Sequence, residues 1–332
     1  MRKYYFILGI IGVTFAISVI GLLLYRFTPT FQRSNQSEII PMENSNRFLY
    51  WYEQEPMRTA RQDLVVAALD GEIYALGGLD GANKVTDVVE IYSPLRNQWR
   101  IGPSLPESRY QAAAATVAEN LYLIGGLSET GKATTDVFVF NKTTQSWSRG
   151  ASLPRELAGH QAAVWEGKIY VVGGYGEESL STDIFVFDPQ QGSWQNMASL
   201  PVMRNDVIAG FVQDDLFVAS GNVFSTTAEN RLDIYDASLG EWSQANIPFS
   251  RKQAVGGGLG EVFVITGGKG ETGAYADVEI FDTLTRLWIT ITPMPTARYG
   301  AAATTIDDRM YFIGGSTGST VSSANNVLEL IR

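Results

Sequence analysis

A pair of small residues, nearly always Gly-Gly, recurs along this chain at a spacing of 47 or 48 residues. The six pairs are Gly77-Gly78, Gly125-Gly126, Gly173-Gly174, Ser220-Gly221, Gly267-Gly268 and Gly314-Gly315. A tryptophan recurs at almost the same spacing, at Trp51, Trp99, Trp147, Trp194, Trp242 and Trp288. Two interleaved markers with one period indicate one supersecondary unit copied six times. Units of this length bury their apolar faces by stacking on neighbouring copies.

Each copy reads as four short strands. In the second copy, Gln111 to Val117 and Leu121 to Ile124 are apolar runs, Asp136 to Phe140 alternates, and a fourth run surrounds Trp147. Short β-branched and aromatic runs bounded by Gly, Pro, Asn and Ser are strand signals, and the repeats show no helical periodicity. Four-stranded units repeated radially predict an all-β fold, a β-propeller.

The copies resemble kelch repeats. The resemblance depends on the glycine pair that ends the second strand and on a third-strand block containing Asp136, Asp183 or Asp277. Segments such as Pro293 to Arg298 then precede the next first strand. The pattern covers residues 46–332. It departs from the family where Ser220 replaces a glycine, Asn230 and Asn326 replace the third-strand Asp, and Leu157 replaces an arginine.

The ends of the repeat region predict how the ring closes. Trp51 has no glycine pair before it, whereas Gly314-Gly315 is followed only by one strand-like run, Asn326 to Ile331. The last copy therefore lacks its tryptophan strand, and the segment around Trp51 has only that strand. Pairing the two completes a sixth blade and removes a free sheet edge. We expect a six-bladed propeller closed by an N-terminal strand.

The segment before the propeller divides into three parts: a tip over residues 1–3, an apolar run over 4–25, and a polar linker over 26–45. The run from Tyr4 to Tyr25 has 22 residues without a charge, enough for a helix to cross a bilayer, with tyrosines at both ends. A cleaved signal peptide is the alternative, but the run is long for one and no small-x-small site follows. We expect an uncleaved single-pass anchor with the propeller on the extracytoplasmic side.

Composition excludes several functions. The chain has no cysteine and one histidine, so it predicts no disulfide, thiol chemistry, multi-histidine metal site or cofactor. Its net charge of −10 argues against nucleic-acid binding, which needs a basic surface. No catalytic residue is predicted, and His160 is expected to face the interior near the channel.

Five arginines occupy one position in six copies, immediately before the first strand: Arg61, Arg109, Arg204, Arg251 and Arg298. In kelch propellers this position commonly lines the mouth of the central pocket. The resemblance therefore implies a guanidinium-lined opening for an anion. Tyr175, directly after a glycine pair, and Tyr299, next to Arg298, are further binding candidates. The alternative is that each arginine pairs with a carboxylate of its own or an adjacent blade, Asp63 and Asp206 being near in sequence.

The predicted function is a non-catalytic, membrane-anchored binding module whose partner is a protein or an anionic ligand such as an acidic peptide, glycan or carboxylate. Two alternatives stay open. One is a sugar-epimerising enzyme of the sialic acid mutarotase type, in which Arg204 or Arg251 would act with Asp206. The other is an accessory subunit of a larger membrane complex.

Overall fold

The computed structural model describes residues 40–41, 47–177, 179–221 and 230–332. Blades 1 to 4 each consist of four strands that are consecutive in the chain. Their strands are β3 (Val65–Leu69), β4 (Glu72–Leu76), β5 (Val89–Ser93) and β6 (Gln98–Ile101) in blade 1; β7 (Ala113–Val117), β8 (Asn120–Ile124), β9 (Val137–Asn141) and β10 (Ser146–Arg149) in blade 2; β11 (Gln161–Trp165), β12 (Lys168–Val172), β13 (Ile184–Asp188) and β14 (Ser193–Asn196) in blade 3; and β15 (Ile208–Val212), β16 (Asp215–Ala219), β17 (Arg231–Asp236) and β18 (Glu241–Asn246) in blade 4.

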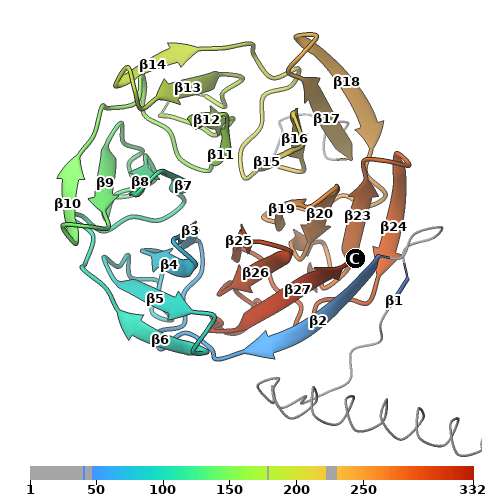
Figure 1. Ribbon diagram of the computed structural model, residues 1–332. Coiled ribbons are helices and arrows are strands. Elements are labelled where there is room, and N and C mark those ends of the chain that lie inside the picture. Colours follow the sequence, from blue (N-terminus) through green and yellow to red (C-terminus); the bar gives the residue numbers. More distant parts are fainter. Residues whose placement is uncertain (1–39, 42–46, 178, 222–229) are drawn as a thin grey trace, which may run out of the picture. The chain divides into compact units, whose positions relative to one another are not determined.

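Blade 5 carries a small extra hairpin, and blade 6 combines strands from both ends of the repeat region. Blade 5 contains β19 (Val255–Leu259), β20 (Val262–Thr266), β23 (Val278–Asp282) and β24 (Leu287–Ile291), with β21 (Lys269–Gly270) and β22 (Gly273–Ala274) as the hairpin; blade 6 contains β25 (Ala302–Ile306), β26 (Arg309–Ile313), β27 (Asn325–Ile331), β2 (Phe48–Gln54) and the two-residue strand β1 (Ile40–Pro41). Figure 1 shows the blades arranged radially, with the first strand of each nearest the centre.

The predicted closure is confirmed. Strand β2 pairs antiparallel with β27 along its whole length, from Phe48 opposite Ile331 to Gln54 opposite Asn325. It thus serves as the outer strand of blade 6, in the place that β6 takes in blade 1 (Figure 1). Because no blade is left with an unpaired strand position, the sheet edge that an open ring would expose is removed.

The glycine pairs tie each blade to the next. Gly77 and Gly78 both have positive φ, 57° and 95°, and the amide of Gly78 donates 2.8 Å to the carbonyl oxygen of Arg109 in blade 2. A side chain on Gly77 would collide with that same oxygen. Blades 2, 3, 5 and 6 repeat this bond from the second glycine of the pair. Glycine therefore recurs at these positions because the backbones of two neighbouring blades approach too closely to leave room for a side chain.

The serial tryptophans pack between blades, as expected. Each packs at a tilt against an aromatic ring of its own sheet, as Trp147 does against Phe140 with ring centroids 5.2 Å apart and an interplanar angle of 49°. The indole of Trp147 also donates 3.1 Å to the carbonyl of Pro103 in blade 1. Trp165, outside the series, stacks on Phe211 of blade 4 at an interplanar angle of 13° and joins the cluster between blades 3 and 4.

The predicted transmembrane run, residues 4–25, lies outside the residues that the structure describes. Within the described ranges, no helix has the length and apolar character that crossing a membrane requires.

Candidate functional site

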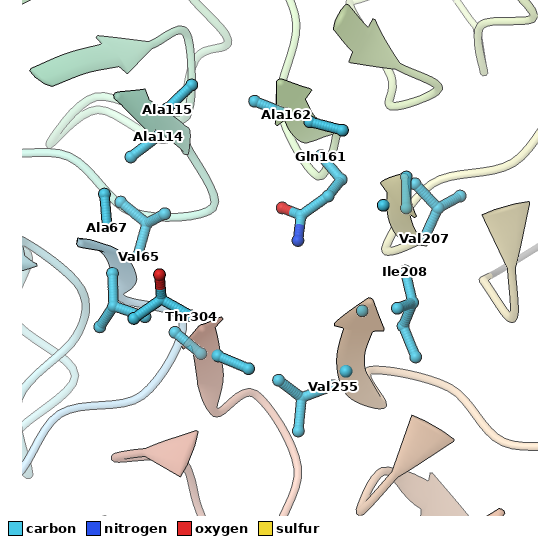
Figure 2. Close-up of a pocket in the computed structure, with 18 of the residues that line it drawn as sticks. Val65, Ala67, Ala114, Ala115, Gln161, Ala162, Val207, Ile208, Val255 and Thr304 are labelled. Carbon is cyan, nitrogen blue, oxygen red and sulfur yellow. The ribbon is translucent and has the colours of Figure 1, made fainter. Parts of the chain in front are cut away.

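A channel runs between the six inner strands and holds a cavity of about 440 Å³. Alanine, glycine and valine supply most of its lining, so small side chains leave the space open. Figure 2 shows the amide of Gln161 extending into this space among apolar neighbours such as Ala162 and Val207, with the hydroxyl of Thr304 also at the wall. Within the described chain, Gln161 makes no side-chain hydrogen bond, so its amide is available to a bound molecule.

His160 lies in the channel wall beside Gln161, which agrees with its expected place near the channel. It is 4% exposed, and its Nε2 lies 3.1 Å from the carbonyl oxygen of Ile124 in blade 2. A carbonyl only accepts, so Nε2 carries the proton and Nδ1 is left as an acceptor, without a partner among the described residues. Burial lowers the pKa of His160 to about 4, which keeps the ring neutral near pH 7.

One residue from each blade forms a ring where the loops enter the inner strands. We call this set the mouth ring: Asp63, Gln111, Gly159, Asp206, Gln253 and Gly300. All six have φ between 50° and 59°. Five of them donate a backbone hydrogen bond of 2.7 to 3.2 Å to the mouth-ring residue of the preceding blade. The mouth of the channel is therefore held by backbone and not by side-chain packing.

The side chains of the mouth ring repeat in the order Asp, Gln, Gly. The two aspartates belong to blades 1 and 4, which lie three blades apart and so face one another across a ring of six. A Cβ placed on Gly300 would lie 2.7 Å from Oδ1 of Asp63, and one on Gly159 would lie 3.0 Å from Oδ1 of Asp206. Each carboxylate thus occupies the space that the preceding blade's glycine leaves empty.

The carboxylate of Asp63 is electrostatically perturbed. Burial, and then the negative charge of Asp206, raise its pKa to about 7, while Lys269 lowers it. Within the described ranges, Asp63 forms no ion pair and its carboxylate accepts no hydrogen bond. A group of this kind in an opening is a functional-site candidate on physical grounds.

The two predicted tyrosines do lie at this opening. Tyr175 donates 2.7 Å from its hydroxyl to Oε1 of Gln111, and burial together with Asp206 raises its pKa to about 12. Tyr299 lies beneath the ammonium of Lys269, 5.0 Å from Nζ to the ring centroid. Both are half-buried. Their backbones pair with Ala158 and Ser316, joining the loop after the glycine pair to the loop before the inner strand.

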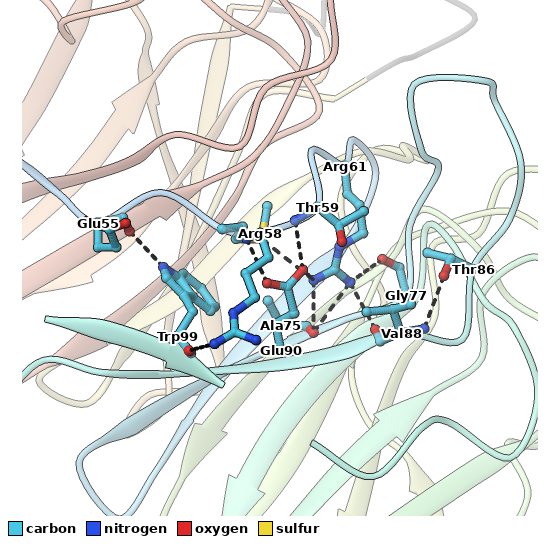
Figure 3. A network of polar contacts seen from close by, with 11 residues as sticks. Glu55, Arg58, Thr59, Arg61, Ala75, Gly77, Thr86, Val88, Glu90 and Trp99 are labelled. Carbon is cyan, nitrogen blue, oxygen red and sulfur yellow. Dashed lines mark hydrogen bonds and ion pairs between the residues drawn. The ribbon is translucent and has the colours of Figure 1, made fainter. Parts of the chain in front are cut away.

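The five predicted arginines lie elsewhere. All are buried, and the cavity lining contains none of them. Figure 3 shows Arg61 inside blade 1, where its guanidinium donates 2.8 Å to the carbonyl of Gly77 and lies 3.4 Å from Glu90. The expectation that the guanidinium groups share the opening is therefore corrected. Each guanidinium makes its contacts inside its own blade.

Carboxylates of the third strand pair with most of these arginines. Arg204 contacts Asp233 at 2.5 Å, Arg109 contacts Asp136 at 2.6 Å, and Arg251 pairs with Glu279. The pairing alternative is thus the arrangement observed, with third-strand carboxylates and not Asp63 or Asp206 as partners. A direct ligand contact by any of the five stays a prediction.

Two blades depart from this pattern. In blade 3, Leu157 takes the arginine position, and Arg155 approaches Asp183 at 3.4 Å instead. In blade 6, Arg298 is fully buried and donates 3.1 Å to the carbonyl of Phe312, while Nε and Nη1 have no partner among the described residues. Asn326 stands there at the register position that Glu90 holds in blade 1. Burial lowers the pKa of Arg298 to about 10.

No metal centre is indicated: the described residues contain no cluster of three or more His, Asp or Glu able to hold an ion. Among the described residues, the charged groups at the mouth include Asp63, Asp206 and the exposed Lys252 and Lys269. The arrangement is suited to non-covalent recognition by hydrogen bonds and charge.

Comparison with known protein families identifies the same repeats that the fold shows. A family model described as the KLHDC2/KLHL20/DRC7 Kelch-repeats domain matches residues 64–251, more than half of the chain. The chain belongs to the kelch-repeat family. Kelch propellers of this kind and their kelch-like relatives indicate protein–protein interaction as the general role.

Individual relatives match over different lengths. Kelch-like protein terF of Aspergillus terreus is 30% identical over 285 residues, which is 82% of this chain and 54% of that protein. The chain therefore spans about half the length of this relative. Human Kelch-like protein 33 is 43% identical over 65 residues, 20% of this chain and 12% of that protein. The solved structure of YjhT superposes with a TM-score of 0.71 at 17% identity, covering 83% of this chain and 99% of that one, a likeness of fold alone.

Proposed function

We propose that this kelch propeller is a non-catalytic binding module that takes its partner at the mouth of the channel, on the face formed by the glycine-pair loops. The observation that carries the proposal is the mouth ring. A backbone-bonded scaffold there presents side chains that differ from blade to blade, and function commonly resides in such loops on a rigid scaffold. The half-buried tyrosines and exposed lysines beside it supply amphipathic contact area and charge.

The arginines are not the proposed contact surface. For Arg204 to reach a ligand, it would have to leave Asp233, and both side chains are fully buried. Separating a buried pair leaves an uncompensated charge, at a cost of about 3–5 kcal/mol. The same placement removes the reason to favour a sugar-epimerising enzyme, because the guanidinium expected to hold a sugar carboxylate is engaged inside its blade.

The test compares the two ends of the propeller. Partners of the full-length chain are captured from expressing cells by crosslinking in mild detergent, with Lys269→Glu and Tyr299→Ser changing the mouth. Leu95→Glu is the matched control: Leu95 is 95% exposed and lies in the turn between β5 and β6, at the opposite end of the strands. We expect the mouth variants to lose specific partners and the control to keep them. Equal recovery by the mouth variants with loss by Leu95→Glu would place binding on the other face.

We also propose that residues 4–25 anchor the chain in a membrane and that the propeller lies on the extracytoplasmic side. The support is the uncharged 22-residue length of the run and its terminal tyrosines. Because the chain has no cysteine, Leu95→Cys introduces a single exposed thiol. Labelling of intact cells by an impermeant maleimide is the expected result, and labelling only after lysis would reverse the orientation. Extraction of the chain by alkaline carbonate would rule out the anchor.

A further inference from the structure

The inner strands follow a residue pattern that two blades break. Two positions after the mouth ring, five blades carry a buried apolar side chain: Val65, Ala113, Ile208, Val255 and Ala302. Blade 3 has Gln161 at this position. Two positions further along, five blades carry alanine or glycine: Ala67, Ala115, Ala163, Gly210 and Gly257. Blade 6 has Thr304 there, so Gln161 and Thr304 are polar exceptions to an apolar pattern.

The two exceptions lie in opposite walls of the channel. Blade 3 and blade 6 are three blades apart in the ring of six, so their inner strands face one another (Figure 1). Figure 2 shows the amide of Gln161 extending into the space and Thr304 at the wall. Because each inner strand starts just after its mouth-ring residue, Thr304 lies two residues deeper than Gln161, about 7 Å along the strand direction. The channel thus presents one polar group near the mouth and a second one deeper, on the other side.

Neither of these side chains is satisfied within the described chain. Both residues are half-buried, and neither forms a side-chain hydrogen bond to the described residues. The hydroxyl of the next residue, Thr305, differs in this respect, because it donates 3.1 Å to the carbonyl of Gly258 in blade 5. The amide of Gln161 offers both donors and an acceptor, and the hydroxyl of Thr304 can serve as either. Polar groups among apolar side chains without a partner cost free energy, so packing alone does not explain these two residues.

The charges of the lining favour an uncharged ligand. Its acidic side chains, Asp63 and Asp206, both belong to the mouth ring, and the described residues of the lining include no lysine, arginine or glutamate. Below the mouth ring, alanine, glycine and valine form most of the walls. An ion there would give up its hydration without meeting an opposite charge, which is strongly unfavourable. The cavity volume of about 440 Å³ is within the range of small-ligand pockets.

We propose that the channel below the mouth binds an uncharged molecule that carries an amide group, with this amide hydrogen-bonded to Gln161 and an apolar body against the alanine and glycine walls. Two amides match one another because each donates through N–H and accepts through C=O. A second polar group about 7 Å from the first reaches Thr304. This site lies inside the channel, whereas the loops around the mouth bind the protein partner proposed above, so the two are tested separately.

The experiment titrates the purified full-length protein with three probes of similar shape, followed by ligand-observed NMR: pentanamide, 2-hexanone and pentanoate. Pentanamide should bind at one saturable site. The ketone 2-hexanone accepts hydrogen bonds but donates none, so it should bind about fivefold more weakly. Pentanoate should show no binding that depends on Gln161, because its charge has no counterpart inside the channel.

Variants of the two polar residues locate the site. Gln161→Val gives blade 3 the kind of residue that the other blades carry, so the fold should persist while pentanamide binds about fivefold more weakly. The matched control is Gln190→Val, at an exposed position in the turn between β13 and β14 of the same blade; it should change affinity less than twofold. The probe 5-hydroxypentanamide should bind about threefold more tightly than pentanamide, and Thr304→Ala should remove that gain.

A blocked tetra-alanine peptide distinguishes the two sources of the amide. Tighter binding of the peptide than of pentanamide assigns the amide to the main chain of a partner, and equal or weaker binding assigns it to a small free molecule. Unchanged pentanamide affinity in Gln161→Val, equal affinity for pentanamide and pentanoate, or no saturable binding of any probe would overturn the proposal. Partner capture that depends on Lys269, without amide binding, would remove this site and leave the function of the mouth standing.

Discussion

The indole nitrogen of Trp99 in blade 1 donates a 2.7 Å hydrogen bond to the backbone carbonyl of Glu55, just beyond the strand that closes the ring (Figure 3). Trp51 makes the equivalent bond to Thr292 at 3.0 Å, from blade 6 to blade 5. Trp147 and Trp194 make the same bond to the blade before, so four of the six serial tryptophans tie neighbouring blades together. Trp242 and Trp288 make no such bond within the described chain, and the indole nitrogen of Trp242 is buried without a partner there.

This difference makes Trp99 and Trp242 a matched pair. Trp99→Phe removes this donor and leaves the carbonyl of Glu55 only the longer 3.4 Å contact from Nδ2 of Asn325. The lost hydrogen bond should cost about 0.5–1.5 kcal/mol of unfolding free energy. Trp242→Phe loses similar volume but no hydrogen bond, so it should cost clearly less. Urea unfolding followed by far-ultraviolet circular dichroism gives both midpoints. Equal shifts in the two variants would show that the indole bond contributes nothing beyond packing.

The buried pair in blade 5 tests whether the arginines are structural. Arg251→Met leaves Glu279 buried and unpaired, and we expect about 3–5 kcal/mol of destabilisation. The double variant Arg251→Met/Glu279→Met should recover most of that loss, because no charge is then left without a partner. A stable Arg251→Met protein that has lost its captured partner would instead support the direct binding role.

Blade 6 offers the converse change. Asn326→Glu supplies a carboxylate to Arg298 at the register position where Glu90 faces Arg61. A charged hydrogen bond to the unpartnered guanidinium nitrogens should stabilise the fold by about 2 kcal/mol. The gain should vanish when Arg298 is replaced by Met in the same chain, which a double-mutant cycle measures. An equal gain without the arginine would attribute the effect to packing.

Asp63 predicts a pH dependence of stability. Its pKa is raised from the unfolded value of about 3.9 to about 7 in the folded state. The protonated form therefore stabilises the fold fully below pH 4, and this contribution is lost as the pH rises to 7. Asp63→Asn mimics that form, so the melting temperature of the wild type relative to Asp63→Asn should fall between pH 4.5 and 7.5.

The comparison with Asp63→Asn is needed because His160 acts in the opposite direction. Its pKa is lowered to about 4 in the fold, so it destabilises the protein as the pH falls from 6.5 toward 4. Both proteins contain His160, and its effect cancels in the difference. Parallel melting curves over this range would contradict the raised pKa of Asp63.

The sequence predicted the architecture because its period reports packing that every copy needs. The glycine pairs, the tryptophans and the unmatched Trp51 strand were sufficient to give six blades and their closure. Side-chain direction was beyond that argument: equivalent backbone positions converge on one end of the ring, but a long guanidinium can extend toward the channel or between strands. The sequence did contain a sign that the arginines point into the blades. Acidic residues follow three of them at a nearly constant separation of 28 or 29 positions: Glu90, Asp233 and Glu279.

The mouth ring was missed for a different reason. Asp, Gln and Gly share little as residue types, and only their common backbone conformation marks them as one set. The sequence argument treated Asp63 and Asp206 only as possible ion-pair partners of nearby arginines, so their charges were assumed to be neutralised. The sequence did contain one sign of the mouth ring. Its residues lie two positions after the arginine position of each copy, and glycine at that place in two copies indicates a left-handed turn.

Closure by β2 also has a consequence for how the protein is made. Tyr50 and its hydrogen-bond partner Glu329 are 279 residues apart, so on the ribosome the first propeller strand is complete long before its neighbour exists. Until β27 emerges, the apolar face of that strand has no sheet to join, and such exposed strands are where nascent chains aggregate. Chaperone dependence and degradation of prematurely terminated chains should therefore concentrate on this one seam.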